Sequence, residues 1–305
     1  MISAANLEEG LSAWPYHVAA VTPLAGGWNS ATWLVDTTDG PYVAKLVDPL
    51  DAPGLISGMH IAEFLAARGV ACGAPARTSQ GELTISLPEG ALALLRHEPG
   101  AVPDLSAPGQ VQRAGRALAR AHRVLRDFPA GADPRYQWPW TWIGQHLDTP
   151  ALPEHVRAAA RRIWPKIVRT VAEQRLTVSI IHADPGPDGF LLGTRDTQDA
   201  LIDWTTTLRG PLLYDLACFA VMTRPAGPQA ARWFAEGYVA ELPEFRPQLA
   251  YLDCLIKARW LANAVYFASR IERGISRGSD SPTANQDGLA DAYAGMTAGP
   301  DVAVP

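Results

Sequence analysis

The chain has 305 residues, of which 48% are hydrophobic and 19% are charged, and its formal net charge is −5. The acidic balance argues against a nucleic-acid partner, and no apolar run is long enough to cross a bilayer. Residues 1–14 include Glu8 and Glu9 and do not resemble a signal peptide. We therefore expect a cytoplasmic globular protein without a membrane partner, present as a monomer or a homodimer.

The cysteines are odd in number and widely spaced, at Cys72, Cys218 and Cys254. This spacing matches neither a disulfide framework nor a zinc site. We expect all three to be buried, unreactive thiols.

Short β-rich runs separated by turn residues fill the N-terminal part of the chain. Asp39-Gly40 stands between two such runs and is a strong hairpin signal. A helical pattern with Ile56, Met59 and Leu65 on one side ends at Gly69. We predict strands over residues 18–24, 31–36, 42–47, 83–87 and 91–96, and a helix over residues 55–68.

Helical patterns dominate after Gly100. Apolar side chains from Val111 to Leu125 share one face of a predicted helix. Further helices are predicted over residues 154–173 and most of 212–273, with a connector at 103–108 and a frayed tail at 297–305. The length and this change in pattern predict two domains, residues 1–97 and residues 98–305.

Two carboxylates stand close together in the sequence, Asp184 in a loop rich in Pro and Gly and Asp203 after a short apolar run. The stretch between them has room for two strands and a tight turn, which would bring both carboxylates to one end of a small sheet. One carboxylate can then accept a proton from a hydroxyl while the other holds a metal against phosphate oxygens. Taken singly, each Asp is also a common turn or capping residue.

Lys45 lies in a β-rich run after the glycine pair Gly26-Gly27. A lysine beneath a glycine turn can bind nucleotide phosphates that approach the backbone closely. Glu63, on the following helix, could pair with Lys45. The alternatives are an edge-strand lysine, a plain hairpin turn and an exposed helix glutamate.

Together these residues resemble the aminoglycoside phosphotransferase and choline kinase superfamily, the small-molecule relatives of protein kinases. The resemblance covers residues 21–266. It rests on the order of Gly26-Gly27-x-Asn29, Lys45, Glu63, residues 95–100, His182-x-Asp184, Ile202-Asp203-Trp204 and residues 210–217. It implies an α+β, protein-kinase-like two-lobe fold, with a small β-rich N-terminal lobe carrying one main helix and a larger, mostly helical C-terminal lobe.

The resemblance also implies a role for each matching residue. Asp184 would be the catalytic base or orienter of the acceptor hydroxyl, and Asp203 would bind Mg²⁺. Lys45, held by Glu63, would bind the phosphates of ATP or GTP. Asp215 would brace the catalytic loop, and His182 would pack and orient it. The remaining nucleotide contacts would come from Gly26, Gly27, Asn29, Ser30, Arg96, His97 and Glu98.

One position departs from the family pattern. The family has an Asn five residues after the catalytic Asp that completes the metal site, whereas this chain has Gly189. Asp188, one residue earlier, is a hard oxygen ligand that could replace it, or it is only a turn residue. In the second case the metal site is weakened.

The resemblance therefore implies an ATP- and Mg²⁺-dependent phosphotransferase acting on a hydroxyl of a small molecule. The leading acceptor class is an antibiotic, such as an aminoglycoside or another natural product. A metabolic acceptor such as choline, homoserine or a sugar is the alternative. Gly189 also motivates a catalytically weak, nucleotide- or ligand-binding pseudokinase. Trp138, Trp140 and Trp142 lie where this family forms its acceptor region, although core packing is a second interpretation.

Overall fold

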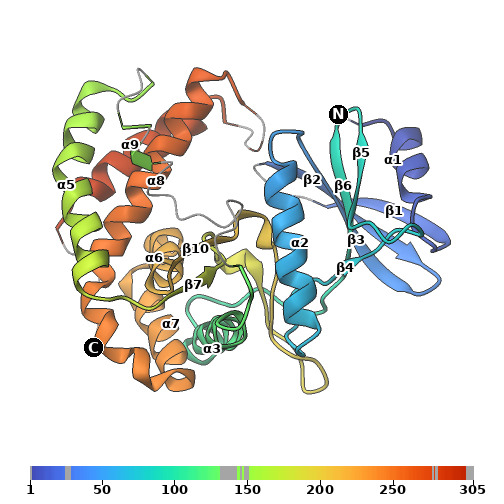
Figure 1. The fold of residues 1–305 in the computed structure, drawn as a ribbon, viewed down its shortest axis with the longest axis horizontal. Helices are drawn as coiled ribbons and strands as arrows, with labels where there is room; N and C mark the ends of the chain where they lie inside the picture. Colours follow the sequence, from blue (N-terminus) through green and yellow to red (C-terminus); the bar gives the residue numbers. More distant parts are fainter. Residues whose placement is uncertain are drawn as a thin grey trace.

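The computed structural model describes residues 2–24, 29–130, 143–144, 146–147, 151–276, 278 and 281–299. An N-terminal β-sheet lies beside a larger helical lobe, and helix α2 (Ala52–Ala66) covers the face of the sheet toward that lobe (Figure 1). The sheet order is β1-β2-β3-β6-β4, with β5 also pairing with β6. Its strands are β1 (Val18–Leu24), β2 (Ser30–Thr37), β3 (Gly40–Val47), β4 (Pro75–Ala76), β5 (Thr84–Leu87) and β6 (Gly90–Arg96).

The predicted strands of the N-terminal lobe are all present, and the turn before β3 forms at Gly40, whose φ is +107°. Such an angle suits glycine because it lacks a Cβ. The sheet has two features that the sequence interpretation missed. One is the short edge strand β4, and the other is helix α1 (Ala4–Leu11), which buries Leu7 and Leu11 against the sheet.

Helix α2 lies unusually close to the segment that follows Asp203. A Cβ added to Gly58 would stand 2.3 Å from the carbonyl oxygen of Trp204, and one added to Gly54 would stand 2.8 Å from that of Thr205. Real side chains do not approach backbone atoms so closely. The two glycines, one helical turn apart, therefore let α2 pack directly on the backbone beside a predicted site residue.

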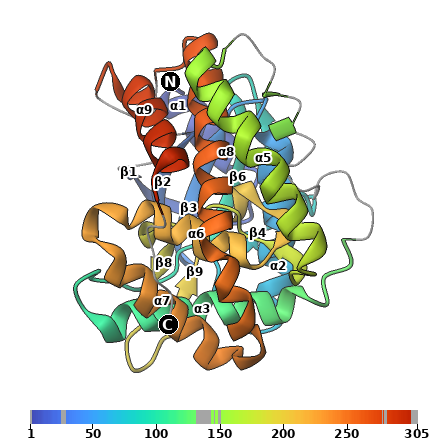
Figure 2. The same ribbon diagram turned by 90° about the vertical axis from the view of Figure 1, so that its left-hand side faces the viewer.

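The helical lobe is built from helices that share one large apolar core. In Figure 2, α8 runs through the middle of this lobe between α5 and α9. The helices are α3 (Pro108–Leu125), α5 (Glu154–Glu173), α6 (Leu213–Met222), α7 (Pro228–Glu241), α8 (Leu252–Glu272) and α9 (Ala284–Thr297). Helix α9 was not predicted. No helix in the described ranges is long and apolar enough to span a membrane.

Two short antiparallel pairs carry the loops of interest. Strands β8 (Phe190–Leu191) and β9 (Ala200–Leu201) form the hairpin predicted between the two carboxylates, and β7 (Val178–Ile181) pairs with β10 (Leu208–Pro211). The predicted α+β architecture, with a small β-rich N-terminal lobe and a larger, mostly helical C-terminal lobe, is confirmed (Figure 1). The division at residues 97 and 98 stays a proposal.

Candidate active site

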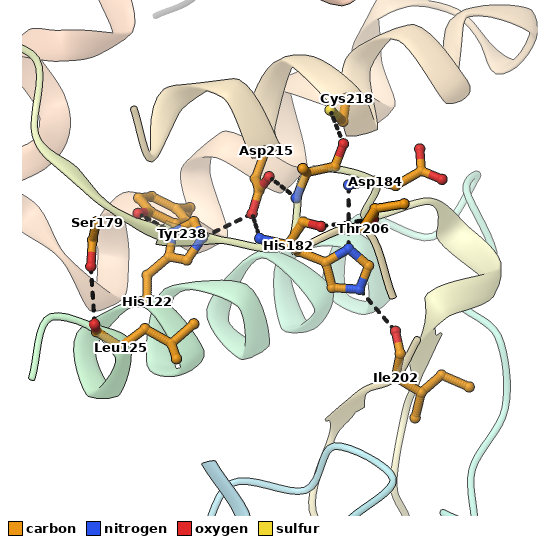
Figure 3. Close-up of polar contacts among 11 residues, drawn as sticks. His122, Leu125, Ser179, His182, Asp184, Ile202, Thr206, Asp215, Cys218 and Tyr238 are labelled. Carbon is orange, nitrogen blue, oxygen red and sulfur yellow. Dashed lines mark hydrogen bonds and ion pairs between the residues drawn. The ribbon is translucent and has the colours of Figure 1, made fainter. Parts of the chain in front are cut away.

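Asp184 lies on the loop that follows β7, and this loop is fixed by a buried carboxylate from α6. Asp215 accepts hydrogen bonds from the backbone N–H groups of His182 and Ala183, each at 2.8 Å. Ala183 has a φ of +68°, a conformation that costs a non-glycine residue about 1–3 kcal/mol. These contacts compensate for that strain, so the predicted bracing role of Asp215 has a structural basis (Figure 3).

A second set of contacts ties Asp215 to two further helices. His122 on α3 donates from Nε2 to the Asp215 carboxylate at 2.9 Å, and its Nδ1 lies 2.8 Å from the hydroxyl of Tyr238 on α7. Asp215, His122 and Tyr238 are all fully buried. Burial raises the pKa of Tyr238 well above its ordinary value, with the Asp215 carboxylate adding to the effect. The sequence interpretation named neither His122 nor Tyr238 as part of this network.

His182 joins the two loops that carry the paired carboxylates. Its Nδ1 accepts from the backbone N–H of Asp184 at 3.3 Å, so its Nε2 carries the proton and donates to the carbonyl of Ile202 at 2.9 Å. Its ring lies 4.8 Å from that of Trp204. His182 therefore orients the loop, as predicted, and has no exposed reactive nitrogen in this arrangement (Figure 3).

Asp203 stands at the start of the turn of 3₁₀-helix η3 (Trp204–Thr206), in the left-handed conformation with a φ of +67°. Its Oδ1 accepts from Lys45 Nζ at 2.5 Å and from Thr205 Oγ1 at 2.7 Å. Burial by itself raises the pKa of Asp203, but the charge and hydrogen bond of Lys45 and the Thr205 hydroxyl outweigh it and hold the pKa at about 2. Asp203 is thus a carboxylate ready to bind a cation.

The predicted ion pair between Lys45 and Glu63 is wrong for this structure. Lys45 Nζ binds Asp203 and, at 2.9 Å, Thr205. Glu63 instead forms two hydrogen bonds of 2.7 Å with the guanidinium of Arg77. Arg77 offers a planar fork that matches a carboxylate, which explains why it takes the Glu63 side chain. The side chain of Lys45 is held by Asp203 and Thr205 on the loop after β9 rather than by α2.

A cavity of about 260 Å³ lies between the lobes at Lys45 and Asp203. Its walls are apolar side chains from β1, β3, α2 and β8, and its far end is the segment from Leu95 to Glu98. The apolar residues include Leu24, Val43, Met59, Leu191 and Ile202. A flat apolar group between these walls, with its charged part toward Lys45, is the ligand that this lining suits.

The polar groups of the segment from Arg96 to Glu98 are partly used within the protein. The N–H of Arg96 donates to Ala74 at 2.8 Å, and that of His97 donates to Pro41 at 3.2 Å. The Glu98 carboxylate accepts from the backbone of Cys72 and Gly73. All three residues line the cavity, and the Arg96 and His97 amides have partners in the protein; their contact with a nucleotide stays a prediction.

The glycine pair Gly26-Gly27 and the cluster of Trp138, Trp140 and Trp142 lie outside the described residues. Asn29, just after the glycine pair, has its side-chain oxygen 3.1 Å from both the Tyr266 hydroxyl and an Arg270 nitrogen on α8. This contact joins the two lobes. Ser30 opens β2 and pairs with Val47 of β3.

Asp188 and Gly189 form the short 3₁₀-helix η2 (Pro187–Gly189). Asp188 is exposed, and the described residues contain no group of three or more His, Cys, Asp or Glu side chains arranged to hold a metal. The Gly189 carbonyl accepts from the N–H of Ile202 at 2.9 Å, so this turn lies beside the Asp203 loop. A Cβ at Gly189 would meet its nearest neighbour, the Ile202 oxygen, at 3.6 Å, an ordinary contact.

Arg259 on α8 forms an ion pair with Asp184 and also hydrogen bonds to Tyr214. Its NH1 donates to the Ala183 carbonyl at 3.3 Å. Burial by itself lowers the pKa of Arg259, but the Asp184 carboxylate more than offsets this and raises it. From the sequence, this helix is expected to supply polar groups to the acceptor from among Asp253, Lys257, Arg259, Asn263 and Glu272, but the pattern does not indicate which of them face inward.

The cysteines are free thiols, and Cys72 and Cys218 are buried as predicted, whereas Cys254 is half-buried. Burial raises the pKa of Cys72 to about 12. A thiol with so high a pKa is protonated at neutral pH and is a poor nucleophile.

A kinase-like fold with an acid–lysine pair at its interlobe cavity defines a class of phosphotransferase. Residues 20–248 match the family model APH, the phosphotransferase enzyme family. The chain belongs to this family, which confirms the resemblance stated from its motifs.

Two curated relatives and one solved structure illustrate the likeness. A homoserine kinase of Bradyrhizobium sp. (strain BTAi1 / ATCC BAA-1182) is 29% identical over 77% of this chain and 74% of its own length. A homoserine kinase of Chelativorans sp. (strain BNC1) is 30% identical over 82% of this chain and 81% of its own length. The structure of amicoumacin kinase hAmiN with AMP-PNP, Ca²⁺ and Ami has a TM-score of 0.76 at 13% identity, and it covers 100% of this chain and 96% of that one. At so low an identity the structural likeness shows the fold alone.

Proposed function

We propose that this protein transfers the γ-phosphate of ATP, with Mg²⁺, to a hydroxyl of a small molecule. The observation that carries the proposal is the pairing of Lys45 with Asp203 at one end of an apolar cavity, beside the loop of Asp184. In-line phosphoryl transfer needs little covalent chemistry from the protein. It needs the nucleotide, the cation and the hydroxyl held in place.

The cavity residues fit a nucleotide in this role. The apolar walls of the cavity suit a purine base. The backbone groups that would contact this base are the amide N–H of Glu98 and the carbonyl groups of residues 96–98. Lys45 offsets phosphate charge. The solved structure of amicoumacin kinase, which holds AMP-PNP and Ca²⁺, supports a nucleotide with a divalent cation. ATP is the proposed donor, and GTP is the alternative.

Asp203 fits a Mg²⁺ ligand because its carboxylate is ionised and supplies hard oxygens. In proteins Mg²⁺ is commonly held by one or two carboxylates together with phosphate oxygens, so a three-residue cage is not required. Asp188 is the proposed second carboxylate. The bound cation would neutralise charge that develops on the transferred phosphoryl group.

Asp184 would accept a hydrogen bond from the acceptor hydroxyl and take its proton as the new P–O bond forms and the bond from the γ-phosphorus to the bridging oxygen breaks, which releases ADP. The buried Asp215, His122 and Tyr238 network keeps this loop from shifting, and Arg259 fixes the Asp184 side chain. Fixed groups of this kind lower the barrier by positioning, which is worth most when no reorganisation is needed during transfer.

Homoserine, a hydroxy amino acid, is the proposed acceptor because curated relatives at 29% and 30% identity carry the name homoserine kinase. This reverses the order of acceptors expected from the motifs, in which an antibiotic came first. The motifs and the relatives favour different acceptors, so the test uses a panel of acceptors rather than one compound.

The test incubates the protein with ATP, Mg²⁺ and separate acceptors, namely L-homoserine, choline, an aminoglycoside and a hexose, and detects products by mass spectrometry. The expected result is one added phosphoryl group on L-homoserine. Tight ATP binding without transfer to any acceptor would contradict the proposal and favour the pseudokinase alternative. If phosphate is transferred only to the aminoglycoside, the proposed reaction stands and homoserine is the wrong acceptor.

A further inference from the structure

One face of α8 carries a polar stripe that links the two parts of the site. Arg259, Asn263, Tyr266 and Arg270 are spaced by four, three and four residues, so they lie on one side of the helix. Arg259 contacts Asp184 at one end of the stripe, and Tyr266 and Arg270 contact Asn29 at the other. The stripe therefore faces the catalytic loop and the start of β2.

Arg259 has more hydrogen-bond donors than the described residues satisfy. Its terminal nitrogens serve Asp184, Ala183 and Tyr214. Its Nε is buried and has no hydrogen-bond partner among the described residues. The side chain as a whole is 15% exposed, next to an Asp184 side chain that is 40% exposed. A buried donor without a partner is unfavourable, and this one lies beside Asp184, where an oxygen of a bound ligand can accept from it.

Asn263, one turn further along the stripe, is half-buried, and its carboxamide has no hydrogen-bond partner among the described residues. A carboxamide both donates and accepts. Arg259 supplies a cation and Asn263 a neutral amide, and none of the four stripe residues is acidic, so beside the Asp184 contact the stripe offers hydrogen-bond donors to an anionic group.

We propose that Arg259 binds a carboxylate of the acceptor, so that its guanidinium bridges this carboxylate and Asp184 while the acceptor hydroxyl meets Asp184. This inference rests on the proposed function and narrows the acceptor to a hydroxy acid. A guanidinium pairs best with planar carboxylate oxygens. A phosphate ester would also bind a guanidinium, but its charge of nearly −2 would stand against Asp184, Asp203 and the nucleotide phosphates.

The test compares two probes that differ only by the carboxylate, L-homoserine and 3-aminopropan-1-ol. Their binding to the full chain in the presence of ADP and Mg²⁺ is measured by calorimetry. Arg259→Gln removes the guanidinium, and Arg259→Lys keeps the charge without the fork. Arg273→Gln, at the exposed end of the same helix, is the matched loss of one positive charge.

We expect Arg259→Gln to raise the Kd of L-homoserine at least about tenfold, with a smaller rise for Arg259→Lys. The Kd of 3-aminopropan-1-ol should change little in either variant, and Arg273→Gln should match the wild type for both probes. Equal weakening of both probes, or no measurable binding of L-homoserine to the wild type, would overturn the inference.

Turnover of the same probes separates this inference from the proposed function. If the carboxylate-dependent binding pattern holds but no phosphorylated product forms, the phosphotransferase proposal fails and the carboxylate site stands. If phosphate is transferred equally well to 3-aminopropan-1-ol and L-homoserine, the phosphotransferase proposal stands and the carboxylate site fails.

Discussion

Arg259 on α8 is ion-paired with Asp184 on the loop that follows β7, so the residue proposed to receive the acceptor hydroxyl is held by the helical lobe itself. Asp203 has the corresponding partner in the N-terminal lobe, Lys45. Each of the two carboxylates at the site therefore has its own cation, one from each lobe. The relative position of the lobes thus governs how Lys45 meets Asp203, whereas His182 fixes the two carboxylate loops to each other within the helical lobe.

Lys45 and Glu63 should behave as independent residues. We expect Lys45→Met to lower kcat/KM for ATP by roughly 100-fold, because it removes the charge that meets the phosphates. Glu63→Gln should leave kcat/KM nearly unchanged and cost at most about 1 kcal/mol of unfolding free energy, since its partner Arg77 is half-exposed. Steady-state kinetics with ATP and denaturant unfolding measure both. If Glu63→Gln lowers kcat/KM as much as Lys45→Met does, the two residues act as a pair and the expectation of independence is wrong.

The proposed metal site can be tested at two adjacent positions, Asp188 and Gly189. We expect Asp188→Ala to raise the Mg²⁺ concentration for half-maximal activity by about tenfold, because it removes a hard oxygen ligand. Gly189→Asn should lower that concentration, since a Cβ fits there without a close contact. Asp196→Ala, at another exposed turn, is the matched control. If Asp188→Ala reaches half-maximal activity at the same Mg²⁺ concentration as the wild type, Asp188 is a turn residue and not a metal ligand.

Helix α2 should be sensitive to one added methyl group. Gly58→Ala would bring a Cβ to 2.3 Å from the Trp204 oxygen and force α2 or η3 to move. We expect a loss of about 1–3 kcal/mol in unfolding free energy together with a raised KM for ATP. Gly109→Ala, in a helix where a Cβ meets nothing within 4 Å, is the control. Equal stability of the two variants would show that the close approach of α2 is dispensable.

The low pKa of Asp203 predicts a specific acid response. A group whose pKa is lower in the folded state adds stability above its unfolded pKa, and this contribution disappears as the pH falls through the folded pKa. We expect the difference in unfolding free energy between wild type and Asp203→Asn to be constant from pH ~7 to ~5. It should shrink below pH ~4 and vanish near pH ~2. Denaturant unfolding at each pH measures it. A difference that grows on acidification would contradict the Lys45 pairing.

Much of this site was predictable because its residues lie in local patterns. Asp184, Asp203 and Lys45 each stand at a strand or loop position that sequence periodicity reveals, and the hairpin between the two Asp residues formed as expected. The partners of charged side chains were not predictable in this way. Glu63 pairs with Arg77, which is 14 residues away in the sequence, and Asp184 pairs with Arg259, which is 75 residues away. These choices depend on how the elements pack.

Two helices escaped prediction for a related reason. Helix α1 has a weak apolar face made of Leu7 and Leu11. These side chains are buried only because the sheet packs against them, and the local sequence does not show this contact. Helix α9 buries only Ala292, Gly295 and Met296, and Gly295 packs on the indole of Trp260. Small side chains of this kind give little periodic signal, although they allow a close helix contact.

The central claim is that Asp184 serves transfer of phosphate to an acceptor hydroxyl rather than binding of ATP. Its direct test is ³¹P NMR of wild type and Asp184→Asn with ATP, Mg²⁺ and L-homoserine, together with ATP affinity measured by calorimetry. Asn preserves the shape and the contact to Arg259 while removing the base. We expect transfer to fall by roughly 10²–10⁴-fold with ATP affinity nearly unchanged. Transfer by Asp184→Asn at the wild-type rate would contradict this claim.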